Sequence, residues 1–435
     1  PDTNAREPAP RRYGERACGN YALEKSIDEY EHMYATHYPG EFRDAGRPVR
    51  PTPIYKKLKV HGAVFAETFG WERAKWFDSS GDGEKYSFRR NNSYESVEKE
   101  CIAVRERVGL LDLTCFAKYE IEGSDAETFL QRICANHIPK REGGVALVHM
   151  LTELGGIECE ATITRIDENK YYALSGAIAE IHDHDWLYHH ILPDEKVSLR
   201  NVTDEYGVLV LAGPRSRDLL SKLTDADLSN SNFPWLRGKT IDVSGIKTLA
   251  LRVSYAGELG WELHIPMQKV KELYDTLMDK GIKFGISNFG TYAMNSLRME
   301  KAYKGWGSEL TTEITPIEAG LERFVDFNKS FIGREATLSR KLLGINTKLV
   351  YMEVDADDTD CLGNEPVLNG EQIIGVTTSG AYGHSVRKSL AFAYVNPQYA
   401  NSGTNFEIRI LGQKRSATVL NEAAYDPQNL RLKDI

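Results

Sequence analysis

Hydrophobic and polar residues alternate along several stretches of the chain with the two-residue period of a β-strand. One such stretch covers residues 249–255, a glycine turn follows at 257–260, and the alternation resumes over 261–265. Residues 270–281 then place apolar side chains at helical spacing and end on a glycine, which is typical of a helix stop. Strand, tight turn, strand and helix in this order indicate the α+β class.

Short strands dominate the end of the chain, over residues 346–435. They alternate with Gly, Asn and Pro, which interrupt strands. This spacing predicts a small β-barrel or sandwich as a separate C-terminal domain. The predicted strands cover residues 349–354, 373–378, 389–395, 406–410 and 417–420.

The first 85 residues differ in composition from the rest and predict an extended arm that packs on something larger. They are rich in Arg, Pro and Tyr, with chain breakers at 47–53 and a dense aromatic run at 62–73. Residues 86–345, in which helices and strands alternate, would form the main α+β region. Within it, a cap signal at 122–125 predicts a short helix containing Phe129, Leu130 and Ile133.

Composition argues against several classes of partner. The 435 residues carry a net charge of -9 without a basic stripe, so we expect no nucleic acid. No apolar run approaches the roughly 20 residues of a membrane helix, so we expect no membrane. The polar start lacks Met and a signal peptide, which suggests a fragment or a processed product. Six singly spaced cysteines indicate reduced thiols in a cytoplasmic or mitochondrial-matrix protein.

Familiar cofactor motifs are missing from the sequence. There is no Gly-x-Gly-x-x-Gly after a strand, no phosphate loop and no Gly-x-Ser-x-Gly elbow, so the chain should not encode its own flavin or nicotinamide domain. One cluster has metal-ligand residue types: His182, His184, Asp185, His189 and His190. On a helix, His182 and His184 cannot share a face, whereas His182 with Asp185, or Asp185 with His189, could. We interpret the cluster as a solvated helix start and expect no metal.

A glycine turn at 155–156 leads into a strand with Glu158, Glu160 and Thr162 on one face. Two interpretations follow from the spacing. These residues are the polar face of an edge strand, or Glu160 lies in a cavity as an acid or base. The charges of a probable helix at 295–301, taken alone, are expected at the surface.

Several motifs together resemble one family. Residues 255–262, Tyr-Ala-Gly-Glu-Leu-Gly-Trp-Glu, resemble the Tyr-Thr-Gly-Glu-x-Gly-Phe-Glu motif of the glycine cleavage T-protein (aminomethyltransferase) family. Further similar segments are 211–214, 296–300 and 331–334. The resemblance is closer to the tetrahydrofolate-binding C-terminal half of dimethylglycine oxidase, dimethylglycine dehydrogenase and sarcosine dehydrogenase, on residues 62–73, 303–313, 318–321 and 378–383.

This resemblance implies a three-domain cloverleaf of the aminomethyltransferase folate-binding fold, with a small C-terminal β-barrel. A pterin ring presents two adjacent N–H donors that one carboxylate can accept as a bidentate pair, and the resemblance gives this role to Glu262. Tyr255 would contact the cofactor through its ring and hydroxyl. Arg298 would polarise the pterin or hold the carboxylate tail of the cofactor, while Phe116 and Thr162 would line the site.

The activity implied by the resemblance is one-carbon transfer. A flavin site oxidises an N-methyl group of a small methylated amine, of the dimethylglycine or sarcosine type. The iminium or formaldehyde then reaches tetrahydrofolate and gives 5,10-methylenetetrahydrofolate, with Glu160 as the catalytic carboxylate. FAD would belong to an upstream domain or a partner subunit. If the chain is a fragment, that domain precedes Pro1; if it is complete, the arm before Ser79 is the docking surface.

Two positions depart from the family pattern. Relatives place Asp where this chain has Glu160, so the carboxylate is displaced by one methylene. T-proteins place Tyr where this chain has Leu147, which favours the oxidase-like subgroup. Two alternatives remain open: a stand-alone folate-dependent O-, S- or N-demethylase that makes 5-methyltetrahydrofolate, and a non-catalytic scaffold or sensor with the folate fold.

Overall fold

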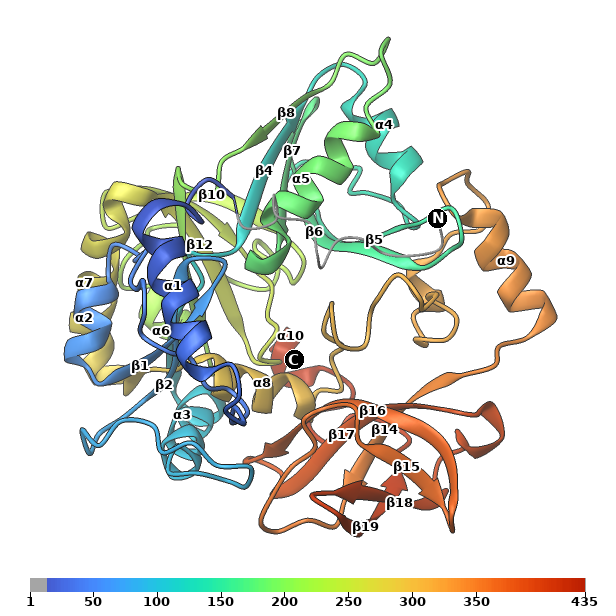
Figure 1. Cartoon of the computed structure of the whole chain (residues 1–435). Coiled ribbons are helices and arrows are strands. Elements are labelled where there is room, and N and C mark those ends of the chain that lie inside the picture. The colour runs from blue at the N-terminus through green and yellow to red at the C-terminus, as the bar shows by residue number, and fades with distance from the viewer. Residues whose placement is uncertain (1–13, 435) are drawn as a thin grey trace.

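Three lobes of the chain lie around a common centre (Figure 1). The computed structural model describes residues 14–434. One lobe is built on a six-stranded sheet, the second on a five-stranded sheet, and the third is a closed six-stranded barrel. The α+β class and the predicted C-terminal barrel are therefore confirmed.

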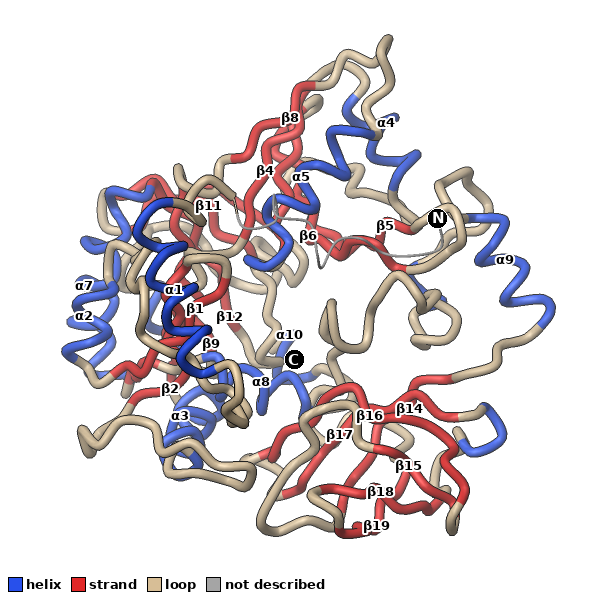
Figure 2. Tube along the Cα trace, viewed as in Figure 1, coloured by secondary structure: helices blue, strands red, loops and turns tan. Residues whose placement is uncertain are grey.

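The N-terminal segment contains regular structure and is not simply extended. It forms helices α1 (Gly19–His32) and α2 (Tyr55–Val60) and an antiparallel hairpin of β1 (Ala63–Thr68) and β2 (Trp71–Phe77), as Figure 2 shows in red and blue. Trp76 is buried among side chains of the first lobe, which anchors the hairpin there. The division of the chain at residue 85 stays a prediction.

The six-stranded sheet of the first lobe is buried on both faces. Along its strand β9, Leu209 and Leu211 pack against one layer of helices, and the alternating Val208 and Val210 pack against another. The first layer is α6 (Ser216–Leu220) and α7 (Val270–Gly281), and the second is α3 (Tyr94–Glu106) and α8 (Thr291–Glu300). The strand order is β10 (Gly238–Val243), β11 (Ile246–Leu251), β12 (Gly260–Pro266), β9 (Tyr206–Ala212), β3 (Val108–Asp112) and β13 (Ile286–Asn288).

The five-stranded sheet of the second lobe is antiparallel, with its hydrophobic face covered by α4 (Ala126–Ile133) and α5 (Glu180–His189). Its order is β5 (Val145–Leu151), β6 (Ile157–Asp167), β7 (Lys170–Ser175), β4 (Ala117–Glu122) and β8 (Ser198–Asn201). The strand that carries Glu160 is β6, which pairs with β5 on one side and β7 on the other. The edge-strand interpretation of this segment is therefore wrong.

The C-terminal lobe is a barrel and not a sandwich, because its first strand pairs with its last. The five predicted strands are confirmed, and one more, β15, was missed because it has only four residues between Gly-rich turns. The helix α9 (Arg334–Leu343) leads into the barrel, and α10 (Leu430–Lys433) returns the chain to the centre (Figure 1). The order is β14 (Lys348–Val354), β17 (Lys388–Val395), β16 (Gln372–Gly383), β15 (Pro366–Asn369), β18 (Asn405–Ile410) and β19 (Gln413–Val419).

Two sequence predictions about local structure need correction. The strand predicted over 249–255 ends at Leu251, and residues 252–255 leave the sheet. The next strand begins at Gly260, which pairs with Ala212 of β9. The helical charges predicted at the surface are instead buried: Arg298, Glu300 and Lys301 are all inside. The predicted helices α4 and α7 are confirmed. Within residues 14–434, no helix combines the length and apolar character that crossing a membrane requires.

A buried carboxyl group makes the stability of the first lobe depend on pH. Burial raises the pKa of Glu100 to about 8, although the carboxylate accepts hydrogen bonds from the backbone N–H of Phe77 and Gly290. The folded state therefore binds this proton more tightly than the unfolded state. The group stabilises the fold fully below its unfolded pKa of about 4.3, and that contribution is lost as the pH rises through about 8.

We predict that Glu100→Gln weakens this pH dependence. Between pH 5 and pH 8, the free energy of unfolding should fall more in the natural chain than in the variant, by a few kcal/mol at about 1.4 kcal/mol per pKa unit. Urea unfolding at the two pH values measures the difference. Glu95→Gln, on the exposed side of the same helix, is the matched control. Equal slopes for the natural chain and Glu100→Gln would contradict the prediction.

Candidate active site

Glu262 lies on β12, with its Cα opposite Val210 on one neighbouring strand and Leu251 on the other. Its Oε2 atom is buried and has no hydrogen-bond partner among the described residues. The Nε2 atom of His264, two residues along the same face of the strand, lies 3.4 Å from that oxygen. A buried carboxylate oxygen normally has a closer partner, so this one is available to a ligand.

His264 links Glu262 to the second lobe. Its Nδ1 atom lies 3.0 Å from the hydroxyl of Tyr172, which belongs to β7 of the five-stranded sheet. Burial lowers the pKa of His264 below its ordinary value, so the ring is neutral near pH 7. When Tyr172 donates to Nδ1, the proton on Nε2 faces Glu262. A neutral ring leaves the charge of Glu262 without a cation beside it.

Tyr255 lies in a recess of the protein surface. Its hydroxyl donates to the backbone oxygen of Lys304 at 3.0 Å, and its ring stacks on Tyr303 with centroids 5.9 Å apart. Burial is the main cause that raises the pKa of Tyr255, yet 41% of its surface is accessible. A side chain that is surrounded by protein and still accessible lines a concave surface. Arg298 lowers this pKa and Glu160 raises it, so both charges act on Tyr255.

Arg298, on α8, is held almost entirely by protein groups. Its Nε donates to Asn295 at 2.9 Å, and its Nη2 donates to Ser379 of the barrel at 2.9 Å. Its Nη1 donates to the backbone oxygen of Tyr303 at 3.1 Å and to the buried carboxylate of Glu309 at 3.2 Å. These bonds use four of the five guanidinium N–H groups. Arg298 therefore joins α8, the following loop and the barrel.

Glu160 points to the same side of β6 as Thr162. Its Oε2 lies 2.8 Å from Nε2 of His149, the residue directly opposite it on β5. His149 is buried, and its Nδ1 has no hydrogen-bond partner among the described residues. Thr162 lies opposite Leu147 on one side and Leu174 on the other. His149, on the neighbouring strand, therefore fixes the position of the Glu160 carboxylate.

Phe116 occupies the junction between the first lobe and the N-terminal hairpin. It packs against the apolar cluster of α3 and α8, and against the small cluster around Trp71 and Cys115. It is only half-buried, so part of its ring remains accessible.

The loop after α8 connects the recess to β6. Trp306 Nε1 donates to the backbone oxygen of Glu158 at 3.0 Å, and Ile157 N donates to the backbone oxygen of Thr311 at 3.0 Å. Gly156 is required at this crossing, because a Cβ there would lie 1.8 Å from the backbone oxygen of Thr312. The glycine turn found in the sequence thus lets the loop approach the strand that carries Glu160.

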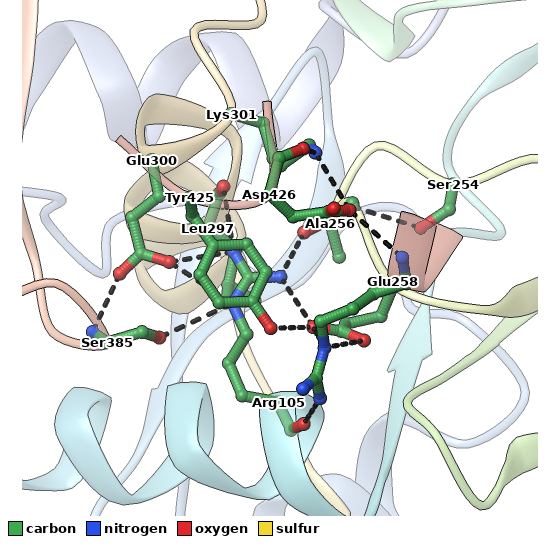
Figure 3. Close-up of polar contacts among 12 residues, drawn as sticks. Arg105, Ser254, Ala256, Glu258, Leu297, Glu300, Lys301, Ser385, Tyr425 and Asp426 are labelled. Carbon is green, nitrogen blue, oxygen red and sulfur yellow. Dashed lines mark hydrogen bonds and ion pairs between the residues drawn. The ribbon is translucent and has the colours of Figure 1, made fainter. Parts of the chain in front are cut away.

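A buried charge cluster lies beneath the site and is shown in Figure 3. The guanidinium of Arg105 on α3 contacts Glu300 at 2.7 Å and Glu258 at 3.3 Å, and it donates to the backbone oxygen of Ala256 at 2.7 Å. The ring of Tyr425 covers it at 3.8 Å, while the tyrosine hydroxyl donates to Glu258. The cluster joins α3, the turn before β12, α8 and the C-terminal segment.

A hollow of about 300 Å³ lies on another side of α8, and none of the predicted site residues lines it. The N-terminal arm, α3 and the barrel enclose it with Pro39, Tyr94, Tyr382 and His384. Asn295 lines this hollow and also accepts the hydrogen bond from Arg298.

Comparison with known proteins identifies the family. The family model for the GCVT N-terminal domain matches residues 54–329, and that for the glycine cleavage T-protein C-terminal barrel domain matches residues 347–426. The chain belongs to the glycine cleavage T-protein family. The crystal structure of aminomethyltransferase T from Bartonella henselae superposes with a TM-score of 0.75 over 87% of this chain and 98% of that one, at 22% identity. This confirms the predicted aminomethyltransferase fold.

Curated relatives of this T-protein family member include much longer proteins. Mitochondrial dimethylglycine dehydrogenase of Mus musculus is 40% identical over 432 residues, which are 98% of this chain and 50% of that protein. A mitochondrial pyruvate dehydrogenase phosphatase regulatory subunit of the same organism is 33% identical over 82% of this chain and 42% of its own length. The chain thus spans about half the length of these relatives. It is an aminomethyltransferase-like module related to dimethylglycine dehydrogenases.

Sequence reasoning missed the groups that support the predicted site of this family member. His264 could have been found from alternation, since it lies two residues after Glu262 on the same strand face. No local sequence pattern pointed to His149, Tyr172 or Glu309, because each reaches the site from another strand or loop. Their positions depend on strand register and lobe packing.

The histidine-rich segment of this family member forms contacts that its spacing did not predict. Cys159, His182 and Asp183 bring their potential ligand atoms within 4.8 Å of one another. The two nitrogens of His182 lie 2.6 Å from Glu158 and 2.8 Å from Asp183. The ring therefore bridges β6 and α5 through two carboxylates. That no metal binds here stays a prediction.

We predict that Arg105→Ala strongly destabilises this T-protein family member, because it leaves Glu300 buried without its cation and Glu258 with Arg431 alone. Removing one partner of a buried ion pair costs about 3–5 kcal/mol. The control is Arg200→Ala, since Arg200 also contacts two glutamates but more than half of its side chain is exposed. Exposed pairs contribute little to stability, so Arg200→Ala should change it far less. Equal losses in urea unfolding would contradict the structural role of Arg105.

Proposed function

We propose that the chain binds tetrahydrofolate in the recess at Tyr255 and transfers a one-carbon unit to it. The observation that carries this proposal is the Oε2 atom of Glu262, which is buried and lacks a hydrogen-bond partner among the described residues. Membership of the T-protein family supports the choice of ligand. The product would be 5,10-methylenetetrahydrofolate, formed with the one-carbon unit that a flavin-dependent N-demethylation releases.

The side chains of the candidate site fit the pterin ring of a folate. A pterin offers two parallel N–H donors, and an unpaired carboxylate accepts both in charge-assisted bonds. Glu262 has the required free oxygen, and the neutral His264 behind it does not compete for the charge. Tyr255 is 41% exposed and its hydroxyl is bonded to the backbone, so its ring would make the contact with the ligand. Phe116 and Thr162 would line the remaining surface.

Arg298 would act indirectly in this proposal. Its bonds to Glu309, Ser379 and the Tyr303 carbonyl leave little of the guanidinium for a ligand. It would hold the loop that positions Tyr255 against the barrel. One N–H group would remain for either direct role that the resemblance implies, polarising the pterin or holding the carboxylate tail.

Glu160 would serve as the proton acceptor or donor of the reaction. Tetrahydrofolate supplies nitrogen nucleophiles for a one-carbon unit at the oxidation level of formaldehyde, and their protons need an acceptor. Glu160 is held by His149 at 2.8 Å and acts electrostatically on Tyr255 and Lys304. Burial lowers the pKa of Lys304, and Glu160 opposes that effect. Glu160 would thus face Tyr255 and Lys304, and among the described residues its ion-pair contact is with His149 and not with a lysine or arginine.

The flavin would belong to a part that this chain does not contain. The chain covers half of the dehydrogenase relative, so FAD is assigned to the other half or to a separate subunit. That part would select a methylated amine such as dimethylglycine or sarcosine. Because the relatives are named as mitochondrial, the mitochondrial matrix is the proposed location for a eukaryotic source.

A second candidate function is a scaffold without catalysis. One relative is named a regulatory subunit, although it shares the same module at 33% identity. Turnover separates the candidates: a scaffold forms no 5,10-methylenetetrahydrofolate when tetrahydrofolate and a flavin-dependent demethylase are both supplied.

The first test is Glu262→Gln. The amide keeps the shape but directs a donor at the donors of the pterin, and charge-assisted bonds to buried groups contribute roughly 1.5–3 kcal/mol. The dissociation constant for tetrahydrofolate should therefore rise about ten- to a hundredfold in calorimetry. Glu335→Gln, fully outside the recess on α9, should leave affinity unchanged. An unaltered constant for Glu262→Gln would rule out Glu262 as the anchor.

The second test is Glu160→Gln, which removes the proton acceptor and keeps the size of the side chain. We expect tetrahydrofolate affinity to stay the same while formation of 5,10-methylenetetrahydrofolate slows by about 10²–10⁴ and free formaldehyde accumulates. Glu160→Asp retains a carboxylate and should keep a measurable part of the rate. If Glu160→Gln and the natural chain give the same product ratio, Glu160 has no role in the reaction.

A further inference from the structure

Helix α1 carries an apolar stripe on its outer side. Leu23, Ile27, Tyr30 and Tyr34 follow one another at spacings of four, three and four residues, which places them on one face of the helix and its C-terminal extension. Their exposed fractions are 58%, 50%, 77% and 94%. We call these four residues the α1 stripe.

The opposite face of α1 is polar and holds the helix to the protein. Tyr21 donates to Glu67 at 2.5 Å, and Lys25 forms an ion pair with the same carboxylate at 2.9 Å. Further along, Asp28 pairs with Arg43 at 2.9 Å. Tyr21, Lys25 and Asp28 repeat at helical spacing, rotated about 200° from the stripe because each residue turns the helix by about 100°. No residue of α1 is fully buried.

This orientation is the reverse of an ordinary surface helix. Such a helix normally buries its apolar face against its own core and shows charge to water. Here polar contacts attach the helix, and two tyrosines, a leucine and an isoleucine lie outside. Aromatic and aliphatic side chains gathered in this way are typical of a surface that another protein covers. Figure 1 shows α1 in dark blue on the outside of the first lobe.

The comparisons indicate which protein covers the stripe. The family model begins at residue 54, so α1 lies outside the body shared with aminomethyltransferases. The match to dimethylglycine dehydrogenase covers 98% of this chain. The unmatched residues are fewer than the 14 residues of α1, so the match must include at least part of this helix. The segment with the unusual surface is therefore common to this chain and a relative twice its length.

We propose that the α1 stripe is the docking surface for the half of the dehydrogenase relatives that this chain does not contain. That half would lie either in the same polypeptide or in a separate subunit. The inference rests on the proposed function, in which that half supplies the one-carbon unit. Polar anchoring by Glu67 and Arg43 keeps the helix in place before the partner binds.

Tyrosine nitration tests the proposal, because two residues of the stripe are tyrosines. The protein isolated from its natural source is compared with residues 1–435 produced alone, and nitrated peptides are measured by mass spectrometry. Tyr188, 62% exposed on α5, is the reactive reference, and the buried Tyr119 is the protected one. In the chain alone, Tyr30 and Tyr34 should react like Tyr188. In the natural protein they should lose reactivity to the level of Tyr119, while Tyr188 stays reactive.

Either of two results would overturn the proposal. Tyr30 and Tyr34 could remain reactive in the natural protein, which would show an uncovered stripe. They could also be protected in the chain alone, with the mass of a dimer, which would identify a second copy as the occupant.

Variants of the stripe distinguish this surface from the folate site. Ile27→Glu in the natural protein should restore nitration of Tyr30 and Tyr34, whereas Leu343→Glu, at an exposed apolar position of α9, should not. If Ile27→Glu leaves both tyrosines protected, the stripe does not make the contact. Calorimetry with tetrahydrofolate on the chain alone should give the same affinity for both variants and the natural sequence. Loss of folate binding in the natural sequence would defeat the proposed function without altering the nitration pattern.

Discussion

The guanidinium of Arg105 lies buried between Glu258 and Glu300, and the candidate site depends on this arrangement. Glu258 belongs to the turn between Tyr255 and β12, and Glu300 ends the helix that carries Arg298. Glu300 must stay close to Arg105, because a buried charge without a partner is strongly unfavourable, and Glu258 is shared between Arg105 and Arg431. The two elements are therefore held at a set separation, and Tyr425 extends the same constraint to the C-terminal segment.

Against this background of paired charges, the two carboxylates of the candidate site have unusual surroundings. Arg105 and Arg298 satisfy the buried glutamates near them. Within residues 14–434, the ion-pair contacts of Glu262 and Glu160 are with a histidine, His264 and His149 respectively, and not with a lysine or arginine. A histidine orients a carboxylate without a permanent opposing charge, so each carboxylate keeps its capacity to accept protons from a ligand. Outside the recess, α1 is attached through Tyr21, Lys25 and Asp28, while its apolar stripe is exposed among the described residues.

Much of the secondary structure could be predicted from the sequence, because it depends on local pattern. The alternation over 261–265, the helical spacing over 270–281 and the short C-terminal strands all describe elements that the structure contains. The errors have one origin. The position of β6 inside its sheet, the end of β11 at Leu251 and the burial of Glu300 depend on which segments pack together, and no local pattern records that.

The sequence by itself determined the α+β class, the C-terminal barrel domain and, through its motifs, the family and six candidate site residues. Those features follow from residue spacing and from motif identity. Only the tertiary structure decided that His264 contacts Glu262 and that His149 contacts Glu160. It also decided that Arg298 is held by the barrel. It also decided that the apolar side of α1 faces outward. Each of these depends on contacts between residues far apart in the chain, whose geometry is set by the packing of sheets and lobes.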